Sequence, residues 1–374
     1  MSLPSAPPDQ PSRRYLLCSR KDGIGARLNN LMWTWRLART ANLGTLCFWP
    51  PLDPYYGESH GAGDLLDVYS IATSNLQDEL KIVDGRPIDF VHQEIVRLEA
   101  ADRHDPMAYA VKSKTHRSSK SPPVPLLDGG VGPILAPGED AEQAAAEFRA
   151  LFARLPLHLR IRQNLKQVEK THDLSRMIAV HVRQGDIVEV LRDACANFTP
   201  ESQAPGSVLD RYIEHFFRGC APPPAYVRLV RTYLTAGYGL LFFSDTPNAA
   251  YPFQKRFHYK MMLAQDLVLP QLTGIQRALF EILMMSRCHA IIGTKSMFSN
   301  LASSIGGAPI IDARRESNPE EFLRAYKRAV GFDQLSPETR AGISQVLVRK
   351  LEENRFLDLW DAGGQDILRL LDAA

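Results

Sequence analysis

The chain has 374 residues, of which 45% are hydrophobic and 23% are charged, and its formal net charge is +2. This composition is typical of a globular protein, and the length exceeds what one hydrophobic core usually supports, so we expect two domains. The near-neutral charge gives no electrostatic basis for a nucleic-acid partner. No stretch reaches the roughly 18 apolar residues that a membrane span needs.

The amino-terminal segment and the cysteines indicate the cellular compartment in which the protein is expected. Residues 1–14 lack the apolar core of a secretory signal, and we expect a disordered tail there. The five cysteines have no Cys-x-x-Cys spacing, which indicates neither a disulfide framework nor a zinc site. Cys18 and Cys47 lie in apolar runs and are interpreted as buried thiols. A reducing cytoplasm is the expected location.

The first half of the chain predicts a βαβ unit. A strand is expected at residues 15–19, a Gly-rich turn at 21–27, a helix at 28–40 and a second strand at 45–48. Residues 101–137 contain Ser, Pro, Gly and basic residues with few aliphatics, and we expect a mobile insertion there. Its basic residues either steer an anionic acceptor or are simply solvated. A helical pattern follows at residues 141–168.

The second half repeats the alternation of strands and helices. Strands are predicted at residues 177–182, 240–244, 267–269, 290–293 and 309–311. A Pro-rich loop is expected after the first of these strands. Helices are predicted at residues 209–217, 275–286, 294–304, 320–330, 337–353 and 366–372. The expected fold class is α/β, with an amino-terminal domain at residues 15–168 and a carboxyl-terminal domain at 169–374.

The segment Met177-Ile-Ala-Val-His-Val-Arg-Gln-Gly-Asp-Ile187 is the most informative in the chain. A buried strand runs into a polar turn, and the carboxyl ends of parallel strands are where open α/β sheets bind ligands. The planar guanidinium of Arg183 suits a phosphate. Asp186 holds that guanidinium or caps the next segment, and a purely structural ion pair is the alternative. His181 points into a cleft or is a hydrogen-bonded residue at the strand end. Glu189 is a base or a solvated residue.

Two further turns combine a strand end with groups that suit ligands. Gly23, Gly25 and Arg27 follow the first strand, where glycines permit close backbone approach and a helix N-terminus attracts anions. A plain strand-to-helix turn is the alternative there. Ser244 and Asp245 end another apolar strand, where a carboxylate binds ribose hydroxyls or base edges, or else caps a turn.

The last constellation extends from Glu281 through Ser299. A strand ends at Gly293, and Thr294, Ser296 and Ser299 lie at the start of the next helix. Hydroxyls together with free backbone N–H groups form an anion cradle. The alternative is N-capping of the helix by Ser or Thr, which requires no ligand. One turn can both cap the helix and bind an anion.

Taken together, these segments resemble the fucosyltransferase superfamily, which includes the α1,6-type, the α1,2-type and the protein O-fucosyltransferases. His181-Val-Arg-Gln-Gly-Asp186 resembles the His-x-Arg-x-x-Asp motif of that family. Phe243-Ser-Asp245 resembles its central Ser/Thr-Asp motif, and the stretch ending in Ser296-Met-Phe-Ser299 resembles its third motif. Asp22-Gly-Ile-Gly-Ala-Arg27 resembles the amino-terminal Gly-x-Gly-Asn-Arg element. The order and spacing of the motifs carry the resemblance.

The resemblance implies a GT-B fold, in which two Rossmann-like domains face each other across a cleft. The donor would be GDP-fucose, held by the second domain without a metal or another cofactor, and the acceptor a glycan or glycoconjugate. Arg183 would bind the β-phosphate, Asp186 would orient its loop, and Thr294 and Ser296 would contact phosphates. Glu281 lies where the family places an Asp near guanine, and Glu189 is a candidate base.

This sequence departs from the family pattern at two positions. Gln184 replaces a second Arg, and Ala26 replaces an Asn. These departures leave room for a transferase that uses another nucleotide sugar, or for an inactive GDP-binding homologue. The acceptor and the oligomeric state do not follow from the sequence.

Overall fold

The computed structural model describes residues 15–19, 23–40, 44–48, 76, 79–83, 126–127, 135, 138–257, 260–294 and 296–373. The predicted tail at residues 1–14 lies outside them. The chain divides into two compact units, one comprising Met1–Gln163 with Pro270–Phe280 and the other Asn164–Leu269 with Glu281–Ala374. No helix among the described residues is long and apolar enough to cross a membrane.

The first unit contains a parallel sheet whose strand order is β3-β2-β1-β4. Its strands are β1 (Tyr15–Ser19), β2 (Gly44–Phe48), β3 (Leu80–Val83) and β4 (Leu126–Leu127). The predicted strands at residues 15–19 and 45–48 are therefore confirmed. Helices α1 (Ile24–Thr40) and α3 (Ala141–Arg154) belong to the same unit. Cys18 and Cys47 are buried free thiols on neighbouring strands, as predicted, with their sulfur atoms 3.8 Å apart.

Three predictions for the first half need correction. Helix α1 begins at Ile24 rather than at residue 28, so the predicted Gly-rich turn is largely its first turn. The predicted helix at residues 141–168 is two helices, α3 and α4 (Leu159–Thr171). Pro156, which lacks a backbone N–H, lies at the break. Strand β4 lies inside the predicted insertion and pairs with β1. Most of that insertion lies outside the described residues.

The second unit contains a five-stranded sheet in the order β7-β6-β5-β8-β9, and every neighbouring pair is parallel. Its strands are β5 (Met177–Val182), β6 (Gly239–Ser244), β7 (Met261–Leu263), β8 (Ala290–Gly293) and β9 (Ile310–Asp312). Counted in chain order, this is the doubly wound order 3-2-1-4-5. The order reverses between β5 and β8, which is where such sheets bind ligands.

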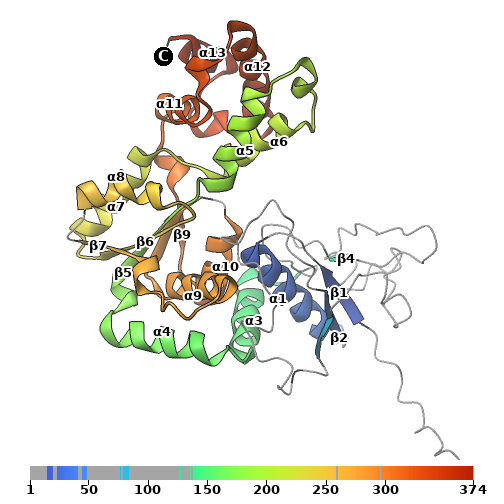
Figure 1. Ribbon diagram of the computed structural model, residues 1–374. Helices are drawn as coiled ribbons and strands as arrows, with labels where there is room; N and C mark the ends of the chain where they lie inside the picture. The colour runs from blue at the N-terminus through green and yellow to red at the C-terminus, as the bar shows by residue number, and fades with distance from the viewer. Residues whose placement is uncertain are drawn as a thin grey trace, which may run out of the picture. The chain divides into compact units, whose positions relative to one another are not determined.

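Helices cover both faces of this sheet. Helices α7 (Pro223–Thr235) and α8 (Tyr251–Phe257) lie on one side, and α10 (Met297–Gly306) lies on the other (Figure 1). Alternate residues of β5, Ile178, Val180 and Val182, pack in the core beneath α7, because side chains alternate across a strand. His181 therefore belongs to the opposite face, where its ring stacks on Phe298 of α10. Helix α9 (Gly274–Arg287) precedes β8.

A separate group of helices forms a second core in this unit (Figure 1). Its aromatic centre consists of Phe216, Phe217, Phe322 and Tyr326. The helices are α5 (Gly185–Ala196), α6 (Val208–Gly219), α11 (Pro319–Val330), α12 (Pro337–Glu353) and α13 (Gly364–Ala373). Short 3₁₀ helices include Leu174–Arg176, Pro200–Gln203, Pro247–Ala250, Ala264–Leu267, Ala313–Glu316, Phe332–Gln334 and Leu357–Leu359.

Two predictions for the second half are wrong. The chain after β5 enters α5 directly, and the expected Pro-rich segment begins only after that helix. Residues 267–269 are not a strand, because the edge strand of the sheet is β7, six residues earlier in the chain. The remaining predicted strands agree with the structure to within a residue or two.

Candidate functional site

Arg183 lies at the carboxyl end of the central strand β5. Val180 of β5 is in register with Ile292 of β8, so the segments that follow the two strands begin side by side at the point where strand order reverses. The Arg183 side chain is 25% exposed, and its Nη2 donates to Asp186 Oδ2 at 3.3 Å. The predicted Arg–Asp contact is confirmed. A partly exposed guanidinium with a single long ion pair has donors left for a ligand.

Asp245 fastens the start of α5 to the end of β6. Its carboxylate accepts from the backbone N–H of Gln184 at 3.0 Å and from that of Gly185 at 3.0 Å. Burial raises the pKa of this carboxyl, while the two N–H donors and Arg183 oppose the rise. Asp245 thus caps the distant helix α5 rather than the turn in which it lies. Ser244 forms a local turn, because its Oγ accepts from the N–H of Thr246.

Gly185 suits this close contact. A Cβ at this position would lie 3.1 Å from Asp245 Oδ2 and 3.3 Å from Cγ2 of Thr246, which is closer than side chains normally approach. Glycine thus permits the close approach of α5 and the β6 turn. Since Asp245 already accepts from the first N–H groups of α5, a bound anion would depend more on Arg183.

The hydroxyls predicted to contact phosphate are engaged within the turn between β8 and α10. Thr294 donates to the carbonyl of Gly219 at 2.6 Å, and Ser296 accepts from the N–H of Phe298 as the N-cap of α10. Ser299 donates to the carbonyls of Thr294 and Ser296. All three predicted residues are buried. Their side chains shape the turn, while the N-terminus of α10 retains its dipole.

His181 is buried against α10 rather than exposed in a cleft. The ring is 6% exposed, and its centroid lies 5.5 Å from that of Phe298. Its Nδ1 has no hydrogen-bond partner among the described residues. Burial, reinforced by the charge of Arg183, lowers the pKa of His181 from 6.5 to about 3. The ring is thus neutral near pH 7 and supplies no positive charge to the site.

The two predicted glutamates differ in position. Glu189 is exposed on α5, one turn after Asp186, on the helix that begins at the site. Glu281 is half-buried in the middle of α9, the helix that leads into β8. The predicted residues Gly23, Gly25 and Arg27 belong to the first unit. The carbonyl of Gly23 accepts from Arg27 N–H in the first turn of α1, and Gly25 and Arg27 are buried.

Three residues at this site were not predicted from the sequence. Cys220 donates from its thiol to the carbonyl of Arg183 at 3.4 Å, and the carbonyl of Gly219 receives Thr294. Tyr226 of α7 donates to the carbonyl of His181 at 3.2 Å. Together these residues tie the ends of β5 and β8 to the junction of α6 and α7. Nothing in the sequence pattern marks them, because their partners are distant along the chain.

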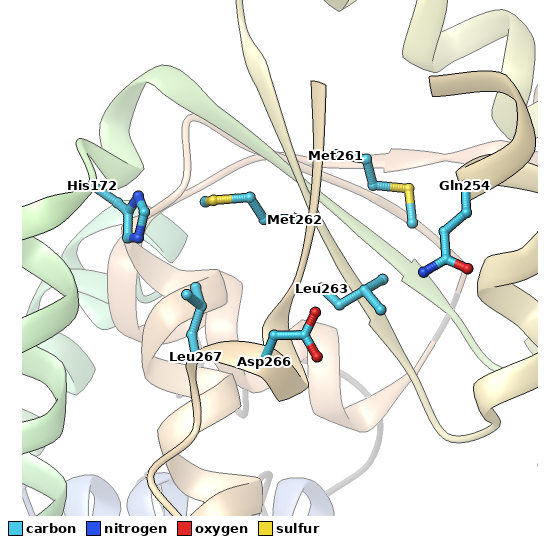
Figure 2. A pocket seen from close by; sticks show the side chains of 7 residues that line it. All are labelled: His172, Gln254, Met261, Met262, Leu263, Asp266 and Leu267. Atoms are coloured by element: carbon cyan, nitrogen blue, oxygen red, sulfur yellow. The ribbon is translucent and has the colours of Figure 1, made fainter. Parts of the chain in front are cut away.

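A pocket of about 390 Å³ lies along the edge strand β7. Figure 2 shows His172 and Met262 on one side of it and Gln254 and Met261 on the other. None of the predicted site residues is among the residues that line it. In the part of the chain that the structure describes, there is no group of three or more His, Cys, Asp or Glu residues that could hold a metal ion.

The solved structures to which this chain is similar include fucosyltransferases. Fucosyltransferase NodZ from Bradyrhizobium shares 14% identity, with 78% of this chain and 92% of that chain covered and a TM-score of 0.45. NodZ alpha-1,6-fucosyltransferase soaked with GDP-fucose shares 16% identity over 80% and 94% of the two chains, at a TM-score of 0.44. POFUT1 in complex with GDP-fucose shares 11% identity over 81% and 98%, at 0.43. No family model and no curated protein matches the chain.

Proposed function

We propose that this protein is an inverting glycosyltransferase that moves fucose from GDP-fucose to a hydroxyl of a glycan or glycoconjugate. The observation that carries the proposal is the position of Arg183. Its partly exposed guanidinium stands at the switch point between β5 and β8, beside the N-termini of α5 and α10. An arginine beside the N-terminus of α10 at one sheet edge favours a diphosphate.

The proposal extends to the whole architecture. We propose that the two units are the two halves of a GT-B enzyme and that the second holds the donor. The strand orders support this assignment, because each unit has a parallel sheet that begins in the doubly wound order 3-2-1-4. In the second sheet, the switch point lies next to the segment His181–Asp186, which we propose binds phosphate.

Charge determines the proposed mechanism. Breaking the bond between sugar and phosphate leaves negative charge on the departing GDP and positive character on the sugar. Arg183 is placed to stabilise the leaving diphosphate, and the dipole of α10 acts in the same direction. His181 is neutral and positions the strand end through packing on Phe298. An in-line acceptor hydroxyl then needs at most a base, for which Glu189 is the candidate.

Nucleotide binding tests the donor class. GDP at about 100 times its dissociation constant should stabilise the protein by about 2.7 kcal/mol, whereas UDP and ADP at the same concentration should not. Thermal melting with the three nucleotides measures this difference. Equal shifts of the melting temperature with all three nucleotides would argue for a transferase that uses another nucleotide sugar.

Turnover tests the activity itself. GDP release from GDP-fucose, assayed over a panel of glycan acceptors with and without EDTA, should proceed equally well in both conditions if no metal takes part. Loss of activity in EDTA, restored by Mn²⁺ or Mg²⁺, would contradict the metal-independent mechanism. GDP binding with no consumption of GDP-fucose on any acceptor would instead favour an inactive GDP-binding homologue.

A further inference from the structure

His215 on α6 is a titratable group near Arg183 that the proposed mechanism does not use. The carboxyl end of α6 is fixed to the site by two contacts described above, from Thr294 to the carbonyl of Gly219 and from the Cys220 thiol to the carbonyl of Arg183. His215 lies one helical turn before Gly219 and therefore on the same side of α6.

Helix α5 packs against α6, and the end of α6 that follows His215 lies against the first turn of α5. A Cβ on Gly219 would lie 2.8 Å from Cδ1 of Ile187, so the two helices approach closely where α5 begins (Figure 1). The charges that act on His215 come from Glu214 and Arg218 on its own helix and from Arg183 and Asp186 on the neighbouring segment. The ring packs on Tyr212 at 5.4 Å, and the residue is exposed to solvent.

We propose that His215 is a binding residue for the diphosphate held at Arg183, and that its imidazole takes up a proton when the anion binds. The inference rests on the proposed GDP site. It adds a second cation to that site, one that exists only in the liganded state.

The free protein supports this assignment. Partial burial of the ring lowers the pKa of His215, although one side of the residue is exposed. The charges of Arg183 and Arg218 also lower this pKa, whereas those of Glu214 and Asp186 raise it. The imidazole is therefore neutral near pH 7 without a ligand. A diphosphate beside Arg183 would neutralise the repulsive charge and offer an acceptor, and both effects favour the imidazolium.

Calorimetric titration of GDP measures the proton directly. The experiment is run near pH 7 in two buffers of different ionisation enthalpy, on the unaltered protein, on His215→Gln and on His289→Gln. His289 is also exposed but precedes β8, at the opposite end of the same sheet. The difference between proteins cancels any proton exchanged by GDP itself. On binding GDP, the His215→Gln variant should take up fewer protons than the other two proteins, by at most about one proton per molecule.

The affinity should follow the same pattern. His215→Gln should bind GDP roughly tenfold more weakly than the unaltered protein at about pH 6.5, with the gap closing toward about pH 8.5 as the imidazole loses its proton. Equal proton uptake and parallel affinity profiles, with GDP still bound, would overturn this inference and leave the proposed function standing. Failure of GDP to bind the unaltered protein would overturn both.

Discussion

At the scale of single residues, Arg183 contributes little to folding. Its ion pair with Asp186 is 3.3 Å long, and both side chains are more than one-fifth exposed, at 25% and 21%. Partly exposed pairs of this kind typically contribute less than about 1 kcal/mol to stability. The guanidinium is therefore available for a ligand, and its removal should affect chemistry more than the fold.

Replacing Arg183 by Ala should lower turnover of GDP-fucose by roughly 100- to 1000-fold, because a preorganised donor to the leaving diphosphate is lost. The turnover of Arg183→Lys should lie between those of the unaltered protein and Arg183→Ala, since Lys retains the charge without the planar fork. Initial rates and thermal melting of both variants provide the measurement. Arg176→Ala is the matched control, since Arg176 is exposed just before the same strand begins. Near-normal rates for Arg183→Ala would assign Arg183 a structural role.

His181 should make stability dependent on pH. The pKa of His181 is about 3 in the folded protein, below its ordinary value of 6.5, so the unfolded chain binds more protons between these values. The free energy of unfolding is then greatest above about pH 6.5 and falls as the pH is lowered toward 3, by roughly 3 kcal/mol at pH 4. Urea unfolding across this range tests it. The free energy of unfolding of His181→Phe should decline less steeply as the pH is lowered. Identical pH dependences of the two proteins would contradict the prediction.

At the scale of elements, the start of α5 is set by its contact with the end of β6. Gln184 is the N-cap of α5 but makes no side-chain capping bond, and Asp245, which is distant in sequence, accepts from the backbone instead. The loop that carries Arg183 is consequently held from both ends, by β5 and by this carboxylate. Any shift of α5 should be felt at the proposed phosphate site.

Gly185→Ala should therefore weaken GDP binding by roughly tenfold, because the new methyl group would push α5 away from Asp245 and displace the Arg183 loop. Gly239→Ala is the control. It lies at the opposite end of β6, where the nearest atom to a new Cβ is the flexible Met177 Cε at 3.4 Å. Calorimetric GDP affinities of the two variants decide the matter. Equal affinities would show that the exact start of α5 is unimportant.

At the scale of the whole molecule, the sequence between β3 and β4 contains four basic residues that are candidates for steering an anionic acceptor. The basic residues Lys112, Lys114, Arg117 and Lys120 lie in it, and β4 follows them as a strand of the first sheet. Deleting residues 101–120, which spares β4, should leave GDP affinity unchanged and alter only acceptor kinetics, more at low salt than at high salt. A large loss of GDP affinity in calorimetry would contradict this. Extending the deletion through Leu127 should also lower the melting temperature.

The sequence alone predicted most strands of the second sheet and the residue types of the motifs. Short apolar runs predicted β5, β6 and β8, because parallel strands that are buried on both faces need apolar residues. The turn after β5 marked Arg183 as a candidate phosphate ligand, because the planar guanidinium suits that role. Local pattern failed at α5, whose first turn depends on Asp245, and at β4, whose two residues are a strand only through pairing with β1.

Only the tertiary structure decided which polar groups remain available. Thr294, Ser296 and Ser299 read as ligands in the sequence, yet their hydroxyls bond to groups of the turn and of α6. The same folding brought Cys220, at the end of α6, to the carbonyl of Arg183, although the pattern of that helix indicates only a buried face. Hydrogen bonds between residues distant in the chain have no periodicity, so sequence reveals candidates for a site, whereas packing determines which of them face a ligand.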